Sequence, residues 1–435
     1  MSDKRFHLGW FTNFGVDEWN AQFHSSGMPW DGEFYVDMAK QLERACFDFI
    51  MLEDTLMLSD VYQHSTEAYL KWAIMAPKHD PAPLAALIGS ATKNLGVIAT
   101  LSTMAYPPFL LARLCATLDH IAHGRFGWNI VTSGEDLAAQ NFGMDKLPPR
   151  ELRYEMADEY VELVNQLFAT WDEDAVVRDY ETDTYADFTK VRPIHFKGKY
   201  FSSRGPLNTV RCPQGKPTYL QAGGSPRGRA FAGKHADSII AVANGVEGMK
   251  AYRDDVRAKA VEAGRNPDDI KVLFLIAPTI GETTEEARAK HERLLHSDLF
   301  LKRALALYGS FTEVDFSPFD LDKPLPYKLT TNGEQGSLDK FMQWGSNKTL
   351  RQLTIEGGNS ASLELVGTPD DVADMMGEAM EAVGGDGFLI TAPSNRINRK
   401  YLIEITEGLI PALQKRGLTR TAYTKSLLKD TLREF

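Results

Sequence analysis

Short apolar runs of strand length alternate with longer amphipathic segments along the chain. The first three runs span residues 6–11, 47–52 and 96–101, and an amphipathic segment at 34–45 separates the first run from the second. Strands that are apolar at consecutive positions are typical of parallel sheets, which helices cover on both faces. The repeat of strand and helix therefore predicts an α/β barrel or a doubly wound sheet.

The rest of the chain contains enough strand candidates to complete a barrel. Further strands are expected at residues 125–131, 217–222, 237–242, 270–280 and 386–391. A total of eight strands predicts a (β/α)8 TIM barrel, because eight is the strand number of that fold. We expect the whole chain, residues 1–435, to form a single domain of this kind.

Long insertions are needed to account for the length of the chain. A bare barrel takes roughly 250 residues, whereas this chain has 435. Irregular polar and aromatic sequence places the insertions at about 133–216, after strand four, and at about 290–365, after strand seven. Segments on the carboxyl side of barrel strands build active sites, so both insertions are expected to form a lid over the barrel.

Polar residues gather where four of the predicted strands end. Asp54 follows the second strand, Ser102 the third, Asn129 and Ser133 lie at the end of the fourth, and Ser225 follows the fifth. The carboxyl ends of barrel strands meet at one mouth. These mostly uncharged hydrogen-bonding groups favour a heterocyclic ligand over a metal ion or a hydrolytic nucleophile.

The glycine pair before Ser225 has two interpretations. Gly223-Gly224-Ser225 lies between a predicted strand and a predicted helix at 229–235. Glycines let backbone N–H groups approach a phosphate, and a helix N-terminus adds partial positive charge. The alternative is an ordinary strand-to-helix turn in which Ser225 caps the helix. A glycine pair alone does not decide between them.

Composition excludes several classes of protein. The net charge of -11 argues against a nucleic-acid or anionic-membrane surface. No apolar run is long enough to cross a bilayer, and we expect no signal peptide, because residues 1–5 lead directly into the first strand. Cys46, Cys115 and Cys212 are scattered, which favours neither disulfides nor a cysteine zinc site. We therefore expect a cytoplasmic protein without a metal site.

Longer motifs carry a specific resemblance. In order along the chain stand ATLDHI at 116–121, GRFGWNIVTS at 124–133, NFG at 141–143, LQAGGSPRG at 220–228 and DGF at 386–388. Together they closely resemble the bacterial-luciferase-like flavin-dependent monooxygenases. The narrower resemblance is to the branch that contains nitrilotriacetate, EDTA and dibenzothiophene-sulfone monooxygenases, and it runs from about residue 6 onwards.

This resemblance implies a function and a set of partners. It implies the oxygenase component of a two-component system, in which an NAD(P)H:flavin reductase supplies FMN as FMNH2. The flavin reacts with O2 to a flavin peroxide, and one oxygen atom passes to a small organic substrate that is aromatic, heterocyclic or organosulfur. The family also suggests a homo-oligomer. A deazaflavin-dependent oxidoreductase on the same barrel and a non-catalytic flavin-binding protein remain alternatives.

The resemblance also implies where FMN binds. Asp54 takes the place of a carboxylate near the flavin ring, and Ser102 and Asn129 hydrogen-bond the isoalloxazine, which makes these two the first catalytic candidates. Ser133 and Tyr154 approach the ribityl-phosphate side. The loop expected to hold the phosphate comprises Ala222, Gly223, Gly224 and Ser225.

The substrate side of the site is less defined. His24 is a third catalytic candidate, as an acid or base in an early loop, although an ordinary loop histidine explains it as well. Phe11 and Trp19 are candidates for the apolar pocket wall, with packing as the alternative. Alkane-oxidising relatives carry a histidine after the Thr-Ser pair, where this chain has Gly134. The substrate pocket therefore cannot be copied from those relatives.

Overall fold

A closed parallel barrel forms the centre of the protein. The computed structural model describes residues 4–12, 32–325, 329–331, 333–334, 337–339, 341, 347–357, 361–393 and 398–435. Around the barrel the strands follow in the order β1 (His7–Thr12), β14 (Gly387–Ile390), β11 (Lys271–Ile276), β10 (Ser238–Ala241), β9 (Thr218–Ala222), β4 (Phe126–Val131), β3 (Gly96–Ser102) and β2 (Phe49–Leu52). Each of these strands overlaps one expected from the sequence, so the predicted TIM barrel is confirmed.

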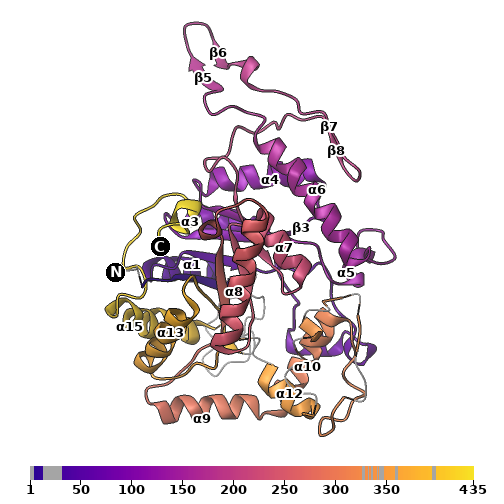
Figure 1. Ribbon diagram of the computed structural model, residues 1–435, viewed down its shortest axis with the longest axis vertical. Coiled ribbons are helices and arrows are strands. Elements are labelled where there is room, and N and C mark those ends of the chain that lie inside the picture. The colour runs from indigo at the N-terminus through magenta and orange to yellow at the C-terminus, as the bar shows by residue number, and fades with distance from the viewer. Residues whose placement is uncertain are drawn as a thin grey trace.

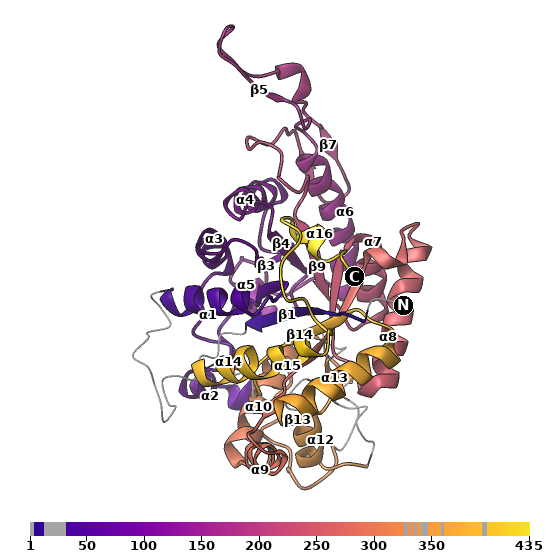
Figure 2. The same cartoon turned by 90° about the vertical axis from the view of Figure 1, so that its left-hand side faces the viewer.

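Helices surround the barrel on its outside (Figures 1 and 2). The helices that connect barrel strands are α1 (Glu33–Arg44), α3 (Pro81–Ala91), α4 (Pro108–Ile121), α6 (Arg150–Phe168), α7 (Pro226–His235), α8 (Gly245–Glu262) and α13 (Pro369–Val383). After β14 the chain forms α14 (Arg399–Ile403), a π-helical stretch (Glu404–Leu409), α15 (Ile410–Lys415) and α16 (Leu428–Thr431). Short helices lie at α2 (Glu67–Trp72) and α5 (Asp136–Gln140).

One expected strand is divided in two. The run at 270–280 was expected as a single strand, but β11 ends at Ile276. Thr279–Ile280 forms β12, which pairs with β13 (Val366–Gly367) in a separate sheet of two parallel strands. Pro278 lies between the two pieces. Because proline has no amide hydrogen to give to the barrel ladder, it favours the end of the strand there.

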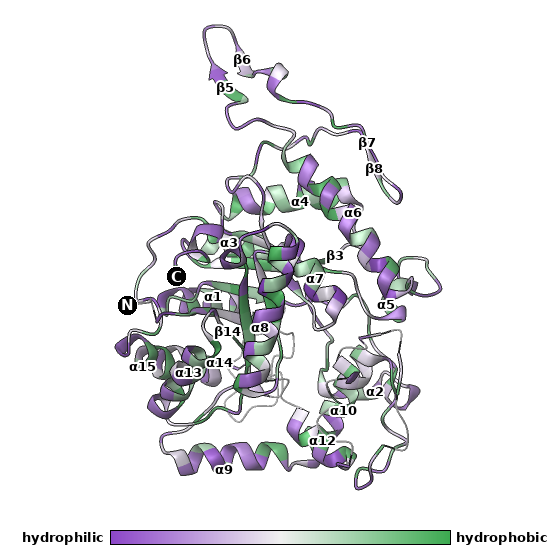
Figure 3. Cartoon of the chain, in the orientation of Figure 1, coloured by the Kyte–Doolittle hydropathy of each residue, from purple (hydrophilic) through white to green (hydrophobic). Residues whose placement is uncertain are grey.

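Alternate residues of the strands pack on opposite sides of the barrel wall. Phe49, Met51 and Ile98 belong to a cluster inside the barrel, whereas Ile50 and Leu52 pack in the larger cluster between the wall and the helices. This split follows from the two-residue repeat of a strand. Figure 3 shows the hydrophobic colouring concentrated on the strands.

The first insertion ends in a projection that we call the arm, residues 171–211. It contains the antiparallel hairpin of β5 (Val176–Asp179) and β6 (Thr184–Ala186), and a second one of β7 (Phe196–Lys197) and β8 (Ser202–Ser203). The arm extends away from the barrel beyond α6 (Figures 1 and 2).

The second insertion builds a small core of its own beside the barrel. It contains α9 (Thr284–Leu295), α10 (Asp298–Thr312) and α12 (Leu350–Gly357). Apolar residues of α10 and α12 form a separate cluster with α2, which includes Tyr69, Leu305, Phe341 and Leu353. This core gives the second insertion a fixed structure next to the barrel mouth.

A buried ion cluster closes the end of the barrel where the strands begin. Arg420 donates to Asp48 at 2.6 Å and to Glu434 at 2.7 Å, and His7 Nδ1 lies 3.1 Å from Asp48. The amide of Leu8 also donates to Asp48, at 2.7 Å. Burial raises the pKa of Asp48, but the charges of His7 and Arg420 outweigh it and hold that pKa below its ordinary value. The cluster therefore keeps a charged carboxylate in the core.

Removal of the arginine should reveal how much the cluster stabilises the fold. We expect Arg420→Ala to lower the free energy of unfolding by about 3–5 kcal/mol, because it leaves a buried carboxylate without its main partner. Arg351→Ala, which removes an exposed ion pair with Asp322, should cost at most about 1 kcal/mol. Urea denaturation measures both. Equal small losses would show that the cluster contributes no more than a surface pair.

Candidate active site

A cavity of about 350 Å³ lies at the carboxyl ends of the barrel strands. Ten of the predicted site residues line it: Phe11, Asp54, Ser102, Asn129, Ser133, Tyr154, Ala222, Gly223, Gly224 and Ser225. Residues that are far apart in sequence meet there because parallel barrel strands all end at the same mouth. The other two candidates, Trp19 and His24, lie outside the described residues.

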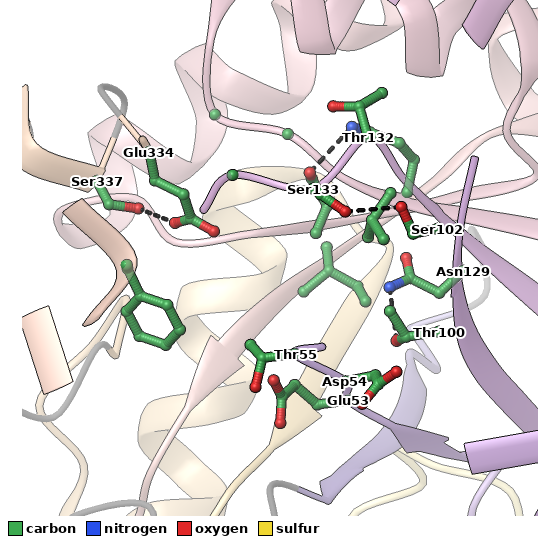
Figure 4. A pocket seen from close by; sticks show the side chains of 18 of the residues that line it. Glu53, Asp54, Thr55, Thr100, Ser102, Asn129, Thr132, Ser133, Glu334 and Ser337 are labelled. Atoms are coloured by element: carbon green, nitrogen blue, oxygen red, sulfur yellow. Dashed lines mark hydrogen bonds between the residues drawn. The ribbon is translucent and has the colours of Figure 1, made fainter. Parts of the chain in front are cut away.

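Hydrogen bonds between neighbouring strands fix the polar floor of the cavity (Figure 4). The Ser102 and Ser133 hydroxyls lie 2.7 Å apart, and Asn129 Nδ2 donates to Thr100 Oγ1 at 2.9 Å. Asn129 Oδ1 is buried and accepts no hydrogen bond from the described residues. A buried acceptor without a partner is costly, and such atoms often face a ligand. Ser133 also has a positive φ of 58°, which is typical of functional sites.

The glycine loop joins β9 to α7 and packs closely. Ser225 Oγ accepts a hydrogen bond from the Gly228 amide at 3.1 Å, so the expected helix cap is observed. A Cβ on Gly228 would lie 2.8 Å from the Tyr154 hydroxyl and one on Gly223 would lie 2.6 Å from Gln221. Only glycine fits at these two positions without a shift of neighbouring atoms.

Side chains from two helices hold the loop from outside the cavity. The Tyr252 hydroxyl donates to the Gly223 carbonyl at 2.5 Å, and Arg229 donates to the Gly224 carbonyl at 2.6 Å. These bonds fix the orientation of two peptide groups beside the N-terminus of α7. The loop therefore has a fixed conformation, whether it binds a phosphate or forms only a capped turn between strand and helix.

Two carboxyl groups lie in the cavity wall, the buried Glu135 and the half-buried Asp54. Burial, reinforced by the negative charge of Glu334, raises the pKa of Glu135 to about 8. Burial also raises the pKa of Asp54 to about 7, although Lys78 opposes it with a positive charge. Glu135 keeps one hydrogen bond, from the Gly134 amide at 3.1 Å. Both groups can therefore exchange protons near neutral pH.

The cationic residues of the cavity come from α6. Arg153 lines the cavity, whereas Arg227, in the first turn of α7, pairs with Asp158 at 2.5 Å and does not line it. Arg150 lines it together with Arg153. Both lie on α6, next to Tyr154, so the positive charge comes from one side of the cavity.

Sequence reasoning missed several polar residues of the wall, among them Thr100, Glu135, Gln221 and Glu334. The signal for Thr100 was available, because it precedes Ser102 by two positions and therefore faces the same side of β3. Gln221 lies in the quoted LQAGGS motif, and its Oε1 is buried without a partner among the described residues. Glu135 and Glu334 come together from different insertions, which no local pattern predicts.

The expected lid is confirmed only in part. The beginning of the first insertion lines the cavity, through residues such as Glu135 and Tyr154, and Phe311 and Glu334 line it from the second. No residue of the range 169–216 lines it, since that part of the insertion follows α6 and consists mostly of the arm. The expectation was wrong for the arm because the chain leaves the barrel after α6 instead of returning over its mouth.

Comparison with known proteins identifies the class. The luciferase-like monooxygenase family matches residues 7–387. N-acetyl-S-(2-succino)cysteine monooxygenase of Bacillus subtilis (strain 168) is 33% identical, over 98% of this chain and 96% of that protein. Nitrilotriacetate monooxygenase component A of Aminobacter aminovorans is 32% identical, over 99% of this chain and 97% of that protein.

A solved structure agrees with these relatives. Riboflavin lyase, determined with modified FMN and riboflavin, has a TM-score of 0.89 and 31% identity, over 99% of this chain and 96% of that one. The chain therefore belongs to the luciferase-like monooxygenase family. It is an enzyme, a flavin-dependent monooxygenase, and its resemblance to the nitrilotriacetate monooxygenase branch is confirmed.

Two features that other functions would require are absent from the described residues. None of the helices in these ranges combines the length and apolar character required to cross a bilayer. Within the same ranges, His, Cys, Asp and Glu side chains do not assemble in groups of three or more that could hold a metal ion.

The raised pKa of Glu135 should make stability depend on pH. Glu135 has a pKa of about 8 in the folded protein and an ordinary pKa of 4.5 in the unfolded chain. Between these two pH values the folded protein keeps a proton on Glu135 that the unfolded chain has released. Stability from this group is therefore lost as pH rises through that window. The melting temperature of Glu135→Gln minus that of wild type should therefore be larger at about pH 9 than at about pH 5.

Glu151→Gln on the exposed face of α6 is the matched control, and it should shift the melting temperature equally at both pH values. Scanning fluorimetry at a series of pH values measures all three proteins. A constant difference between Glu135→Gln and wild type would show that Glu135 is ionised throughout.

Proposed function

We propose that this chain is the FMNH2-dependent oxygenase component of a two-component system and transfers one oxygen atom from O2 to a small organic substrate. The observation that carries the proposal is the single cavity in which the strand-end polar groups and the glycine loop converge. Family membership supports the class of reaction, and the riboflavin lyase structure determined with modified FMN supports FMN as the cofactor.

The residues of the cavity fit a reduced flavin. Its ring presents N–H donors, and Asn129 Oδ1 and Gln221 Oε1 are buried acceptors without a partner among the described residues. Ser102 offers a hydroxyl on the same floor. These groups come from rigid strands, so they can hold the ring without reorganisation during the reaction.

The other end of the cavity fits a phosphate. Ser225 and Gly228 lie in the first turn of α7, where backbone N–H groups and the helix dipole favour an anion. Tyr154 approaches the same turn, and Arg150 and Arg153 add positive charge to the cavity. We assign the phosphate to the Ala222–Ser225 loop and the ring to the floor formed by β3 and β4.

Within this arrangement each group has a defined task. FMN, when bound in its reduced form, supplies the electrons that activate O2. Ser102 and Asn129 orient the ring. Asp54 and Glu135, whose pKa values of about 7 and about 8 lie near neutrality, can hold or release a proton beside it. The described lid residues restrict access of water to the site.

The substrate is expected beside apolar residues of the cavity wall, which include Phe11, Leu56 and Phe311. An organosulfur compound is the class that we favour, because N-acetyl-S-(2-succino)cysteine is the substrate in the name of one relative. The other relative is named as component A, which supports a separate NAD(P)H:flavin reductase as the partner. The free thiols of Cys46, Cys115 and Cys212 agree with a cytoplasmic location.

Two alternatives predict different behaviour. A deazaflavin-dependent oxidoreductase would turn over without O2 and without a reductase. A non-catalytic flavin-binding protein would hold flavin but show no oxygen uptake that depends on a substrate. The relatives at 32–33% identity are named as monooxygenases, which favours the oxygenase over both.

The phosphate assignment can be tested by a change of charge that preserves the helix cap. Aspartate caps helices as well as serine, so Ser225→Asp should leave the fold intact. Its negative charge should raise the dissociation constant for reduced FMN by about tenfold or more, equivalent to about 1.4 kcal/mol. Riboflavin lacks the phosphate, so its affinity should be unchanged.

Ser225→Asn is the uncharged control and should bind both ligands as wild type does. Anaerobic fluorescence titration gives the constants. If Ser225→Asp weakened FMN and riboflavin equally, the phosphate would lie elsewhere and the loop would serve only the fold.

The reaction itself can be tested with a reconstituted system. We expect the purified chain with FMN, NADH and a generic flavin reductase to oxygenate one or more members of a panel of thioethers, sulfones and small heterocycles. Product analysis by mass spectrometry with ¹⁸O2 measures the transfer of one oxygen atom. Label in the product that disappears without the reductase supports the proposal. Turnover with a deazaflavin under anaerobic conditions would replace it with the first alternative.

A further inference from the structure

A lysine outside the cavity holds the residues that follow β2. Lys78 lies in the connection between α2 and α3, and its side chain is 9% exposed. Its ammonium group donates to a carboxylate oxygen of Glu53 at 3.1 Å and to Thr55 Oγ1 at 2.6 Å. These two residues flank Asp54, and all three line the cavity, whereas Lys78 does not. Lys78 therefore bonds to both chain neighbours of Asp54 without being part of the cavity wall.

These two contacts fix a segment that has no regular structure of its own. Residues 53–55 follow β2 directly and belong to neither a strand nor a helix. Figure 4 shows the side chains of Glu53, Asp54 and Thr55 together at one edge of the cavity. A functional group on such a segment keeps its orientation through hydrogen bonds that its neighbours make outside the site. The contacts of Lys78 thus determine where the Asp54 carboxyl group lies.

The same ammonium group acts on Asp54 through its charge. Burial raises the pKa of Asp54 to about 7, and the positive charge of Lys78 opposes this increase, while the negative charges of Glu53 and Asp80 reinforce it. Tyr106 lies within reach of the charge of Asp54, but its pKa of about 12 keeps the phenol neutral near pH 7. Among these charged groups, Lys78 is the one that favours the carboxylate form of Asp54.

The position of Lys78 makes its charge effective. The side chain of Lys78 is 9% exposed and that of Glu53 is 15% exposed, so salt screens their charges less than those of surface groups. A positive charge within a few ångströms lowers the pKa of a carboxyl group by about 1–3. Without Lys78, Asp54 would therefore take up its proton well above pH 7. With Lys78, Asp54 titrates near neutrality, where a group transfers protons most effectively.

We propose that Lys78 is a positioning residue of the oxygenase, which fixes the segment that carries Asp54 and supplies the positive charge that favours its carboxylate form. The effect on turnover rests on the proposed function, whereas the effect on Asp54 exists in the protein without flavin. A purely structural role for Lys78 would need only its hydrogen bonds. The proposed role also needs its charge, and this difference can be measured.

The first part of the test measures the titration of Asp54 in protein without flavin. Asp54 has a pKa of about 7 in the folded protein and an ordinary pKa of 3.8 in the unfolded chain. Stability from its protonated form is lost as pH rises through this window. The melting temperature of Asp54→Asn minus that of its parent should therefore increase across the window and become constant above about pH 7. Scanning fluorimetry at a series of pH values measures this limit.

The same measurement is then made in the background of lysine variants. In Lys78→Met the limit should move to higher pH by about 1 unit or more, because the charge that opposes burial is missing. Lys78→Arg keeps the charge and should restore the wild-type limit. Lys71→Met is the matched control, since it removes an exposed lysine of α2 that pairs with Glu67. It should leave the limit unchanged.

A double variant separates the charge from the hydrogen bonds. Lys78→Met with Glu53→Gln removes both charges of the ion pair, so the limit should return toward the wild-type pH although the bonds of Lys78 are missing. Two results would overturn the proposal. One is an unchanged limit in Lys78→Met. The other is a limit in the double variant that is as high as in Lys78→Met, because the lost contacts would then explain the shift.

The second part measures turnover in the reconstituted system with flavin reductase. The pH dependence of kcat/KM for product formation should move to higher pH in Lys78→Met by the same amount as the limit, and Lys78→Arg should restore it. A shifted titration with an unshifted profile would overturn the role of Lys78 in turnover. A wild-type protein that oxygenates no compound would contradict the proposed function, and the titration without flavin would still decide whether Lys78 controls Asp54.

Discussion

The parallel direction of all eight strands is the constraint on which the rest of the structure depends. Because the strands are parallel and the barrel is closed, all their carboxyl ends emerge at one rim. The end of β2, which precedes Asp54, and the end of β9, which precedes Ser225, are far apart in the sequence and still face one cavity. The site is therefore a consequence of topology, and the loops only complete it.

The other end of the barrel must be sealed for this arrangement to hold. Leu428 and Leu432 join the interior cluster, and a Cβ on Gly96 would lie 2.6 Å from Leu428. The Asp48–Arg420 pair then fixes the segment that carries these leucines to the start of the strands. With the lower interior filled, the space that remains for a ligand lies at the upper rim.

The sequence predicted the strands well, and the physical reason is their continuous apolar pattern. It also predicted the residues that end those strands, because the rim follows from the topology. What it could not predict came from contacts between distant loops, such as the approach of Glu334 to Glu135. It also failed for the arm, since polar hairpins that leave the barrel and polar loops that cover it have the same composition. Trp19 and His24 lie outside the described residues, so their roles stay predictions.

The raised pKa values of Asp54 and Glu135 connect the fold with the chemistry. A carboxyl group keeps its proton near neutral pH where it is shielded from water or lies beside other negative charge, and the pKa of Glu135 rises to about 8 mainly by burial. The same scarcity of water protects the electrons of a reduced cofactor from unproductive release. Both insertions contribute to this site, because Glu135 from the first and Glu334 from the second line the cavity. Burial of these two carboxyl groups lowers the stability of the fold, and the same burial lets the site exclude water from its reaction.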